Sequence, residues 1–202
     1  MTMKTNGDEK LNDTALVDFF YEVGQLKRQP RAGWHLLGIK TPESVAEHTC
    51  RAVFMAYVLA KLEGANADKA ALIAAFHELP ETRIGDLHKM AVHYFPDKKN
   101  VERSVITEQL APLPTEIAKG FHEFLDGEAN DATPEHLIAK DADYLEVIMR
   151  AREYMVAGHV GAKNWADNAS TCLKTASAKR LAAAIMKSEP SAWYERLKSI
   201  KR

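Results

Sequence analysis

Imidazole and carboxylate side chains stand in this chain at places where the neighbouring residues are apolar. His77 and Glu78 end a run rich in alanine, leucine and isoleucine, where polar groups are costly to bury unless they are paired or bound to an ion. His48 has Val45 and other apolar residues at helical spacing, so we expect it to face inward. Asp143 precedes another apolar helical stretch. Two imidazoles and two carboxylates from three segments therefore predict a site for a divalent metal ion.

The predicted ligands indicate a group of metals and one kind of chemistry. Mixed nitrogen and oxygen ligands suit Mn²⁺, Co²⁺, Fe²⁺, Ni²⁺ or Zn²⁺, with Mg²⁺ as a further candidate, and the sequence does not choose among them. An octahedral ion with four protein ligands keeps positions for water and a phosphate oxygen, so it can activate both. Glu81 and Asp86 could position that water or protonate the leaving oxygen, or could hold a second ion.

A zinc-protease motif of the HExxH type is excluded. Glu81 stands where the second histidine of that motif is required, and Pro80 would disturb the helix that must carry it. A zinc protease of this type is therefore not expected.

The order of these residues resembles a known family. His48, then His77 followed by an acidic residue, then a distant Asp143 resemble the H…HD…D pattern of HD-domain phosphohydrolases. The longer blocks resemble the branch of 5′-deoxynucleotidases, over roughly residues 16–185; they are residues 31–34, 41–48, 77–87 and 140–146. This resemblance implies an all-α, single-domain helical bundle of the HD-domain type. It also implies removal of the 5′-phosphate from deoxyribonucleoside monophosphates.

The resemblance assigns roles to individual residues. The positions of the family's four metal ligands are held here by His48, His77, Glu78 and Asp143. Glu81 falls on the acidic residue that acts in proton transfer or water positioning, and Asp86 is taken as catalytic and as a substrate contact. The implied substrate-binding residues are Arg31, Trp34, Asp86, Leu87, His88 and Lys89. Trp34 falls on an aromatic that packs near the sugar and helps to reject a 2′-hydroxyl. Family members are commonly homodimers.

Two positions depart from the family pattern. Glu78 replaces the aspartate that gives the HD motif its name, and its longer side chain can shift the ion relative to the substrate. Gly33 stands directly before Trp34 where some members have an arginine, and Arg31 lies two residues earlier.

Other interpretations stay open for several residues and for the function. Glu81 and Arg31 could be solvated charges, and Trp34 could be an aromatic staple that fixes its loop to the bundle. An HD-type nucleoside triphosphohydrolase, or a phosphohydrolase for a specialised nucleotide, would use the same ligands. A nucleotide-binding module weakened in catalysis by Glu78 is the alternative that is not an enzyme.

The elements that must position these residues are all expected to be helices. Apolar periodicity predicts helices over 14–27, 41–63, 67–79, 97–111, 114–125, 134–157, 163–187 and 190–199. Thr41 is the expected N-cap of the second helix, Gly64 its stop and Asn66 the cap of the third. Residues 31–40 are expected to be looped or extended, and 81–96 less regular. We expect a bundle of roughly seven to nine helices in a domain over 13–202, after a flexible polar arm over 1–12.

Composition limits the possible partners. The 202 residues are 46% hydrophobic and 27% charged with a net charge of −1, which predicts a buried core and no general electrostatic field for nucleic acid or membranes. A small anionic nucleotide must then be held by a local cluster of charges. No apolar signal segment opens the chain, and Cys50 and Cys172 are not spaced as a metal or redox pair. These features predict a cytoplasmic protein with reduced cysteines.

Overall fold

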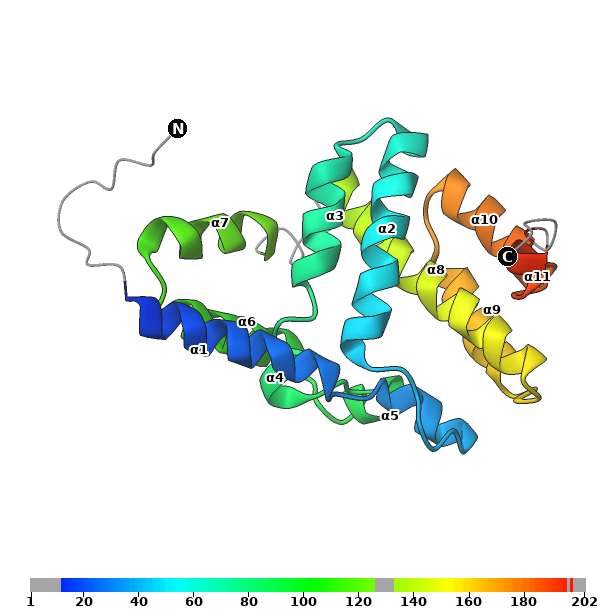
Figure 1. Ribbon diagram of the computed structural model, residues 1–202, viewed down its shortest axis with the longest axis horizontal. Helices are drawn as coiled ribbons and strands as arrows, with labels where there is room; N and C mark the ends of the chain where they lie inside the picture. Colours follow the sequence, from blue (N-terminus) through cyan, green and yellow to red (C-terminus); the bar gives the residue numbers. More distant parts are fainter. Residues whose placement is uncertain (1–11, 126–132, 196, 198–202) are drawn as a thin grey trace.

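The computed structural model describes residues 12–125, 133–195 and 197, and the regular elements in this part of the chain are helices (Figure 1). The longer α-helices are α1 (Asp13–Val23), α2 (Val45–Glu63), α3 (Ala67–Phe76), α6 (Lys98–Leu110), α7 (Thr115–Leu125), α8 (Pro134–Val156), α9 (Ala162–Cys172) and α10 (Ala176–Met186). Short elements are the 3₁₀ helices η1 (Gly24–Lys27) and η2 (Ala32–Leu37), with α4 (Glu81–Ile84), α5 (Lys89–Val92) and α11 (Ala192–Glu195). The all-α prediction is confirmed, whereas the predicted arm lies outside the described residues except for Asn12.

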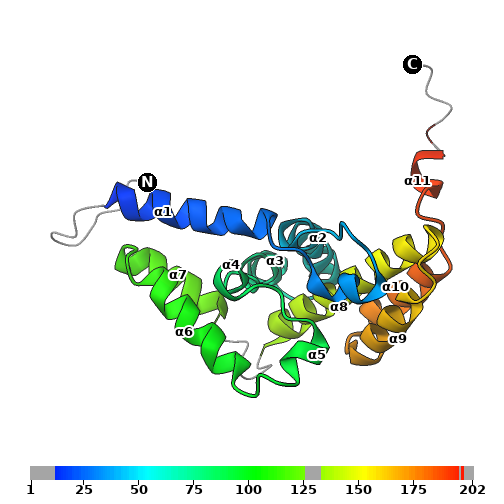
Figure 2. The same cartoon turned by 90° about the horizontal axis from the view of Figure 1, so that it is seen from below.

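The main core forms around α8. Figure 1 shows this helix running behind α2 and α3, and α9 and α10 pack against it (Figure 2). Alanines recur every four residues on α2, at Ala52, Ala56 and Ala60, and none is exposed. Their small side chains let the facing helices approach closely. Ile148 and Leu145 of α8 fill the space between the helices, so α2 and α8 are held at a close and fixed spacing.

A smaller core joins α1 to α6 and α7, on the left of Figure 1. Phe19 of α1 meets Leu110 of α6 and Leu113 there, and the ring of Phe121 stands edge-on to Phe19 with centroids 5.4 Å apart. Leu79, in the turn between α3 and α4, is buried in the same cluster. This turn is therefore anchored in the smaller core immediately after His77 and Glu78.

The start of α2 corrects one prediction. Thr41 is not the N-cap: the helix begins at Val45, and Ser44 caps it. The Ser44 hydroxyl accepts a hydrogen bond from the Glu47 backbone N–H, while the Glu47 carboxylate accepts one from the Ser44 N–H at 2.6 Å. Because this capping box satisfies two backbone donors at once, it outcompetes the Thr41-Pro42 start. The helix ends at Glu63, and Gly64 adopts a left-handed conformation with φ of 74°, as the sequence predicted.

Other boundaries also differ from the predictions. The expected helix over 163–187 is two helices, because the chain turns at Leu173 and Thr175 caps α10. Asp141 of α8 stabilises that turn by accepting hydrogen bonds from the backbone N–H groups of Lys174 and Thr175. The third helix stops at Phe76 instead of continuing to 79, and most of the expected loop over 31–40 is η2.

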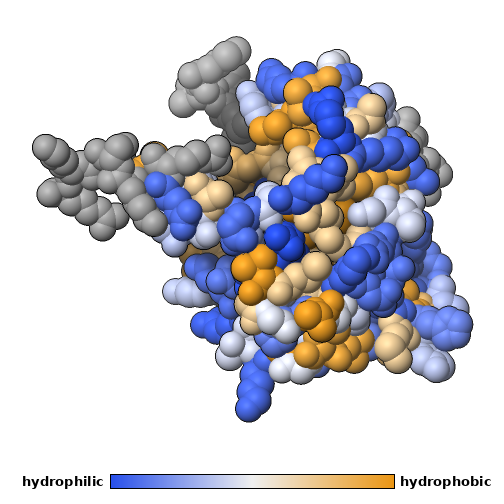
Figure 3. Space-filling model, turned by 90° about the vertical axis from the view of Figure 1, so that its right-hand side faces the viewer, coloured by the Kyte–Doolittle hydropathy of each residue, from blue (hydrophilic) through white to orange (hydrophobic). Residues whose placement is uncertain are grey.

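The surface mixes polar and apolar side chains. Seen from the side of the C-terminal helices, hydrophobic patches alternate with hydrophilic ones (Figure 3). Among the helices that the structure describes, none combines the length and the apolar character needed to cross a membrane.

The capping box at the start of α2 is expected to contribute to the stability of the protein. Ser44→Ala should lower the free energy of unfolding by about 1 kcal/mol, because it removes the acceptor for Glu47 N–H. Thr41→Ala, at an exposed residue outside the helix, should change it by less than about 0.5 kcal/mol. Urea denaturation followed by circular dichroism measures both values. A larger effect at Thr41 than at Ser44 would contradict the assignment.

Candidate metal centre

The four predicted metal ligands come together from three parts of the fold. His48 lies in the second turn of α2, His77 and Glu78 follow the last residue of α3, and Asp143 lies in the middle of α8. One donor atom from each lies within 4.8 Å of the others. Two ligands on opposite sides of one ion lie about 4.2 Å apart, since each bond is about 2.1 Å long. The spacing is therefore close to that of a single mononuclear site.

Unsatisfied atoms inside the cluster support this interpretation. His48 Nε2 and Asp143 Oδ1 are buried and lack a hydrogen-bond partner among the described residues, although they are 2.9 Å apart. The Nε2 atoms of His48 and His77 lie 3.6 Å and 3.2 Å from the same Glu78 oxygen. Buried polar atoms without partners are costly. A cation bound between these nitrogen and oxygen atoms would satisfy them together, so the residues fit a divalent metal ion.

The histidines are oriented by bonds on their other ring nitrogen. The Nδ1 of His77 lies 2.8 Å from the Ala74 carbonyl, which can only accept, so this nitrogen carries the proton. The Nδ1 of His48 lies 2.5 Å from Glu146 Oε2. Both rings therefore point Nε2 toward the cluster, which is the arrangement found in metal-binding histidines.

The carboxylates of the cluster are held in their ionised form. Burial favours protonation of Glu78, but the nearby His77 and Arg31 outweigh it and hold the pKa of this carboxyl well below its usual range. Burial acts in the same way on Asp143, but His48, 2.9 Å away, and the charge of Arg31 outweigh it and lower the pKa of this carboxyl. Ionised carboxylates are the form that binds divalent metals. The Glu78 substitution therefore keeps a charged oxygen donor at the second position of the motif.

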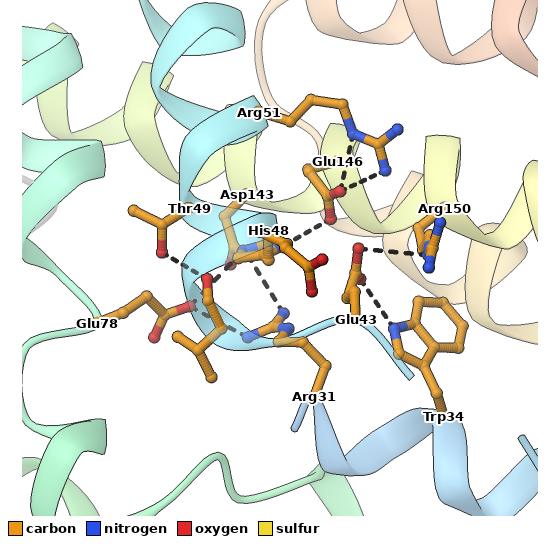
Figure 4. A network of polar contacts seen from close by, with 12 residues as sticks. Arg31, Trp34, Glu43, His48, Thr49, Arg51, Glu78, Asp143, Glu146 and Arg150 are labelled. Carbon is orange, nitrogen blue, oxygen red and sulfur yellow. Dashed lines mark hydrogen bonds and ion pairs between the residues drawn. The ribbon is translucent and has the colours of Figure 1, made fainter. Parts of the chain in front are cut away.

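Arg31 lies inside this cluster rather than on the surface. Its guanidinium is 3.1 Å from Glu78, 3.6 Å from Asp86 and 3.7 Å from Asp143, as Figure 4 shows for the first and last of these. Burial alone would lower the pKa of Arg31, but these carboxylates outweigh it and raise the pKa above its usual value. The interpretation of Arg31 as a solvated surface charge is wrong.

Glu81 and Asp86, the two acidic residues that follow Glu78 in the sequence, lie in different environments. Glu81 is buried at the start of α4, and one of its oxygens has no hydrogen-bond partner in the described structure. Burial, with the negative charges of Glu78 and Asp86, raises the pKa of Glu81 to about 10, so the carboxyl carries a proton at neutral pH. Asp86 accepts a hydrogen bond of 2.7 Å from the Ala32 N–H at the start of η2. Asp86 therefore also fixes the segment that carries Arg31.

A cavity of about 350 Å³ lies beside the cluster, and Asp143 belongs both to the cluster and to the lining of the cavity. All six predicted substrate-binding residues line it: Arg31, Trp34, Asp86, Leu87, His88 and Lys89. The sequence analysis missed the lining residues that α8 and α9 supply, which are Tyr144, Val147, Asn164, Trp165, Asn168 and Ala169. Asn164 and Asn168 are four residues apart, so the sequence could have predicted that they share one face of a helix. It could not have predicted that this face lines the cavity.

Trp34 is both a packing residue and an edge of the cavity. Its side chain is 3% exposed, its ring meets Tyr154 edge-on at 5.0 Å, and its indole N–H donates to Glu43 at 3.0 Å. The staple interpretation is thus confirmed alongside a place in the cavity wall. At Gly33, a Cβ atom would lie 3.2 Å from the Trp165 indole nitrogen, so a longer side chain is crowded there.

Comparison with known proteins places the chain in a family. Residues 23–186 match the family described as HD domain. The chain belongs to the HD-domain family. Among curated relatives, this HD domain is 31% identical over 140 residues to the human 5′-deoxynucleotidase HDDC2, covering 69% of this chain and 68% of that protein. It is 30% identical over 151 residues to a 5′-deoxynucleotidase of Photorhabdus laumondii, covering 70% and 75%.

Solved structures share the same HD-domain architecture. A conserved hypothetical protein of Pyrococcus furiosus superposes with a TM-score of 0.69 and 28% identity, over 85% of this chain and 99% of the other. A predicted metal-dependent phosphohydrolase of Magnetospirillum magnetotacticum, 21% identical, superposes with a TM-score of 0.67 over 86% and 90%. At that identity the second similarity concerns the fold alone.

Two aspartates on α8 provide a matched test of the metal centre. Asp143→Asn should weaken Mn²⁺ or Co²⁺ binding at least about 100-fold, more than the loss of an outer-shell partner would, because it removes a charged ligand. Asp141→Asn should leave the affinity nearly unchanged and lower the free energy of unfolding by about 1–3 kcal/mol, since its amide group would face the Lys174 and Thr175 donors. Isothermal titration calorimetry and urea denaturation measure these effects. Equal metal affinities in the two variants would rule out Asp143 as a ligand.

Proposed function

We propose that this protein is a metal-dependent phosphohydrolase that removes the 5′-phosphate from deoxyribonucleoside monophosphates. The observation that carries the proposal is the cluster of His48, His77, Glu78 and Asp143, whose Asp143 also lines the neighbouring cavity. The cavity volume of about 350 Å³ lies at the small end of the usual range for small-molecule sites, about 300–1,000 Å³. The relatives named 5′-deoxynucleotidase support the same substrate class.

Arg31 is suited to bind the phosphate. It is the cation that lies between the metal ligands and Asp86, and a guanidinium binds phosphate oxygens through two parallel hydrogen bonds. A divalent ion bound by the four ligands would polarise the phosphoryl group and lower the pKa of a bound water. Arg31 would then hold the phosphate group in line for attack at phosphorus.

Glu81 is suited to protonate the leaving group. When water attacks phosphorus and the bond from phosphorus to O5′ breaks, that oxygen needs a proton. Glu81 is buried next to Glu78 and holds a proton at neutral pH in the metal-free protein. A cation bound to Glu78 would offset part of the negative charge and lower this pKa. That change makes the proton easier to transfer.

Trp34 is suited to reject ribonucleotides. Its indole N–H is already bonded to Glu43, so the ring edge in the cavity wall presents carbon atoms only. A 2′-hydroxyl placed against this edge would lose its hydrogen bonds to water without replacement. Deoxyribose lacks that hydroxyl and avoids the loss.

We propose in addition that the protein is a cytoplasmic homodimer. Its two cysteines are free thiols, which suits a reducing compartment. Phe54, Val58 and Leu62 lie four residues apart on one face of α2 and are 71%, 50% and 50% exposed, so a second copy could cover them. Sedimentation velocity measures the mass. A single species of 22.5 kDa at micromolar concentration would contradict the dimer.

The experiment that tests the proposed function is an assay of released phosphate. Deoxyribonucleoside monophosphates and the matched ribonucleotides are each incubated with Mn²⁺, Co²⁺, Mg²⁺, Zn²⁺ or EDTA. We expect metal-dependent orthophosphate from the deoxy series, little from the ribo series, and almost none from Asp143→Asn. Release of pyrophosphate or tripolyphosphate from triphosphates, with none from monophosphates, would favour a triphosphohydrolase. Nucleotide binding without turnover under every metal would favour a binding module.

Glu81→Gln tests the assigned proton donor. The variant should keep its affinity for metal and lose about 10²–10⁴-fold in kcat, because glutamine keeps the shape but has no acidic proton. In the wild type, kcat should fall as pH rises through the pKa of Glu81, where the protonated form is lost. This alkaline decline should be absent from the residual activity of the variant. A variant with wild-type kcat would remove Glu81 from the mechanism.

A further inference from the structure

The metal ligand His48 is held from behind by a carboxylate that is itself completely buried. Glu146 lies one helical turn after Asp143 on α8 and has 0% exposure, as does His48. Its Oε2 lies 2.5 Å from His48 Nδ1, on the side of the ring away from Asp143 (Figure 4). The ring is thus fixed between two side chains of the same helix.

This contact decides which ring nitrogen can bind a metal. A neutral imidazole has one N–H and one nitrogen with a free lone pair, and only the second can bind an ion. An ionised carboxylate accepts hydrogen bonds but cannot donate them, so Nδ1 must carry the proton when Glu146 is charged. The lone pair is then on Nε2, which faces Asp143 and Glu78.

Arg51 holds the other oxygen of Glu146. Its Nε and Nη2 atoms both donate to Glu146 Oε1, at 2.9 Å and 2.6 Å. The two carboxylate oxygens therefore have separate partners, one on Arg51 and one on His48. Arg51 and His48 lie three residues apart on α2, so the contacts also tie α2 to α8 at the level of the metal ligands.

A second metal ion behind His48 is the competing explanation, because Glu43, His48 and Glu146 also bring three donor atoms within 4.8 Å. The carboxylates of this group already have cationic or donor partners. Glu43 accepts from the Trp34 indole and lies 3.3 Å from Arg150, while Glu146 is held by Arg51. Two guanidinium groups thus supply the positive charge, and the group acts as a support for His48 rather than as a metal site.

We propose that Glu146, clamped by Arg51, is the positioning residue that sets the tautomer and orientation of His48 for metal binding. The inference deepens the proposed function, because it rests on His48 as a ligand, and it is independent of the nucleotide that is hydrolysed. Glutamine cannot replace Glu146 fully. Either orientation of its amide turns an NH₂ group toward Arg51 or toward His48 Nδ1, and the second orientation moves the ring proton onto Nε2.

The test measures Co²⁺ binding to the full-length protein without nucleotide, by calorimetry and by the visible absorption of the bound ion. Glu146→Gln should weaken binding about 10–100-fold, the usual effect of losing a partner behind a metal-bound histidine, and should change the absorption spectrum. Glu153→Gln is the matched control, because Glu153 also bonds to Arg51 at 2.5 Å but does not touch His48. It should change the affinity less than about fivefold.

Arg51→Gln supports the test if Glu146→Gln does not fold, since it leaves the carboxylate but removes its clamp. It should weaken Co²⁺ binding in the same direction and to a smaller extent. Wild-type affinity and spectrum in the folded Glu146→Gln variant, or in Arg51→Gln if the former is unfolded, would overturn the proposal. An equal loss in Glu153→Gln would reduce the effect to general destabilisation. Failure of the phosphate-release assay with normal Co²⁺ binding would refute the proposed substrate class and leave this inference standing.

Discussion

The structure of the site depends on compensating several acidic side chains that are buried close together. Four carboxyl groups gather at the centre of the site: Glu78, Glu81, Asp86 and Asp143. Such a group would be unstable in an apolar interior without compensation. Arg31 lies among them, and the segment that carries it must therefore fold back onto the bundle. The position of η2 against α8 and α9 follows from this requirement as much as from packing.

The same balance explains why a cation belongs in the site. Glu78 and Asp143 are held ionised, while Glu81 takes up a proton because a further charge cannot be accommodated. A divalent ion adds positive charge where these groups meet. A metal ion that binds the folded chain but not the unfolded chain also stabilises the fold by mass action. Chemistry and folding stability are thus linked through the same few side chains.

The sequence was sufficient to predict that the four candidate metal ligands come together, and insufficient to predict their surroundings. His48, His77, Glu78 and Asp143 could be grouped because each stands in an apolar helical setting. The turn at Leu173 could not be predicted, because it depends on hydrogen bonds to Asp141, more than thirty residues earlier. The α2 start was misplaced because two capping signals follow each other within four residues, and only the three-dimensional contacts show which one is used.

The wall of the cavity shows the same limit at longer range. Trp165 comes close to Trp34 only because α9 packs against α8, and no local sequence pattern predicts this contact. Partners behind the ligands were equally hidden. Glu146 was visible as a charge near Asp143, but its contact with His48 spans 98 positions along the chain.

The candidate metal ligands and part of the cavity lining lie on different helices, and this separation affects how the sequence of such a protein can change. The four candidate metal ligands come from α2, from α8 and from the end of α3, whereas Asn164 and Asn168 lie on α9 and are not part of that cluster. Substitutions at these two exposed positions would change the cavity lining without altering any candidate ligand. A change of sequence confined to α9 can therefore alter the shape and polarity of the cavity while the four residues of the metal cluster stay the same.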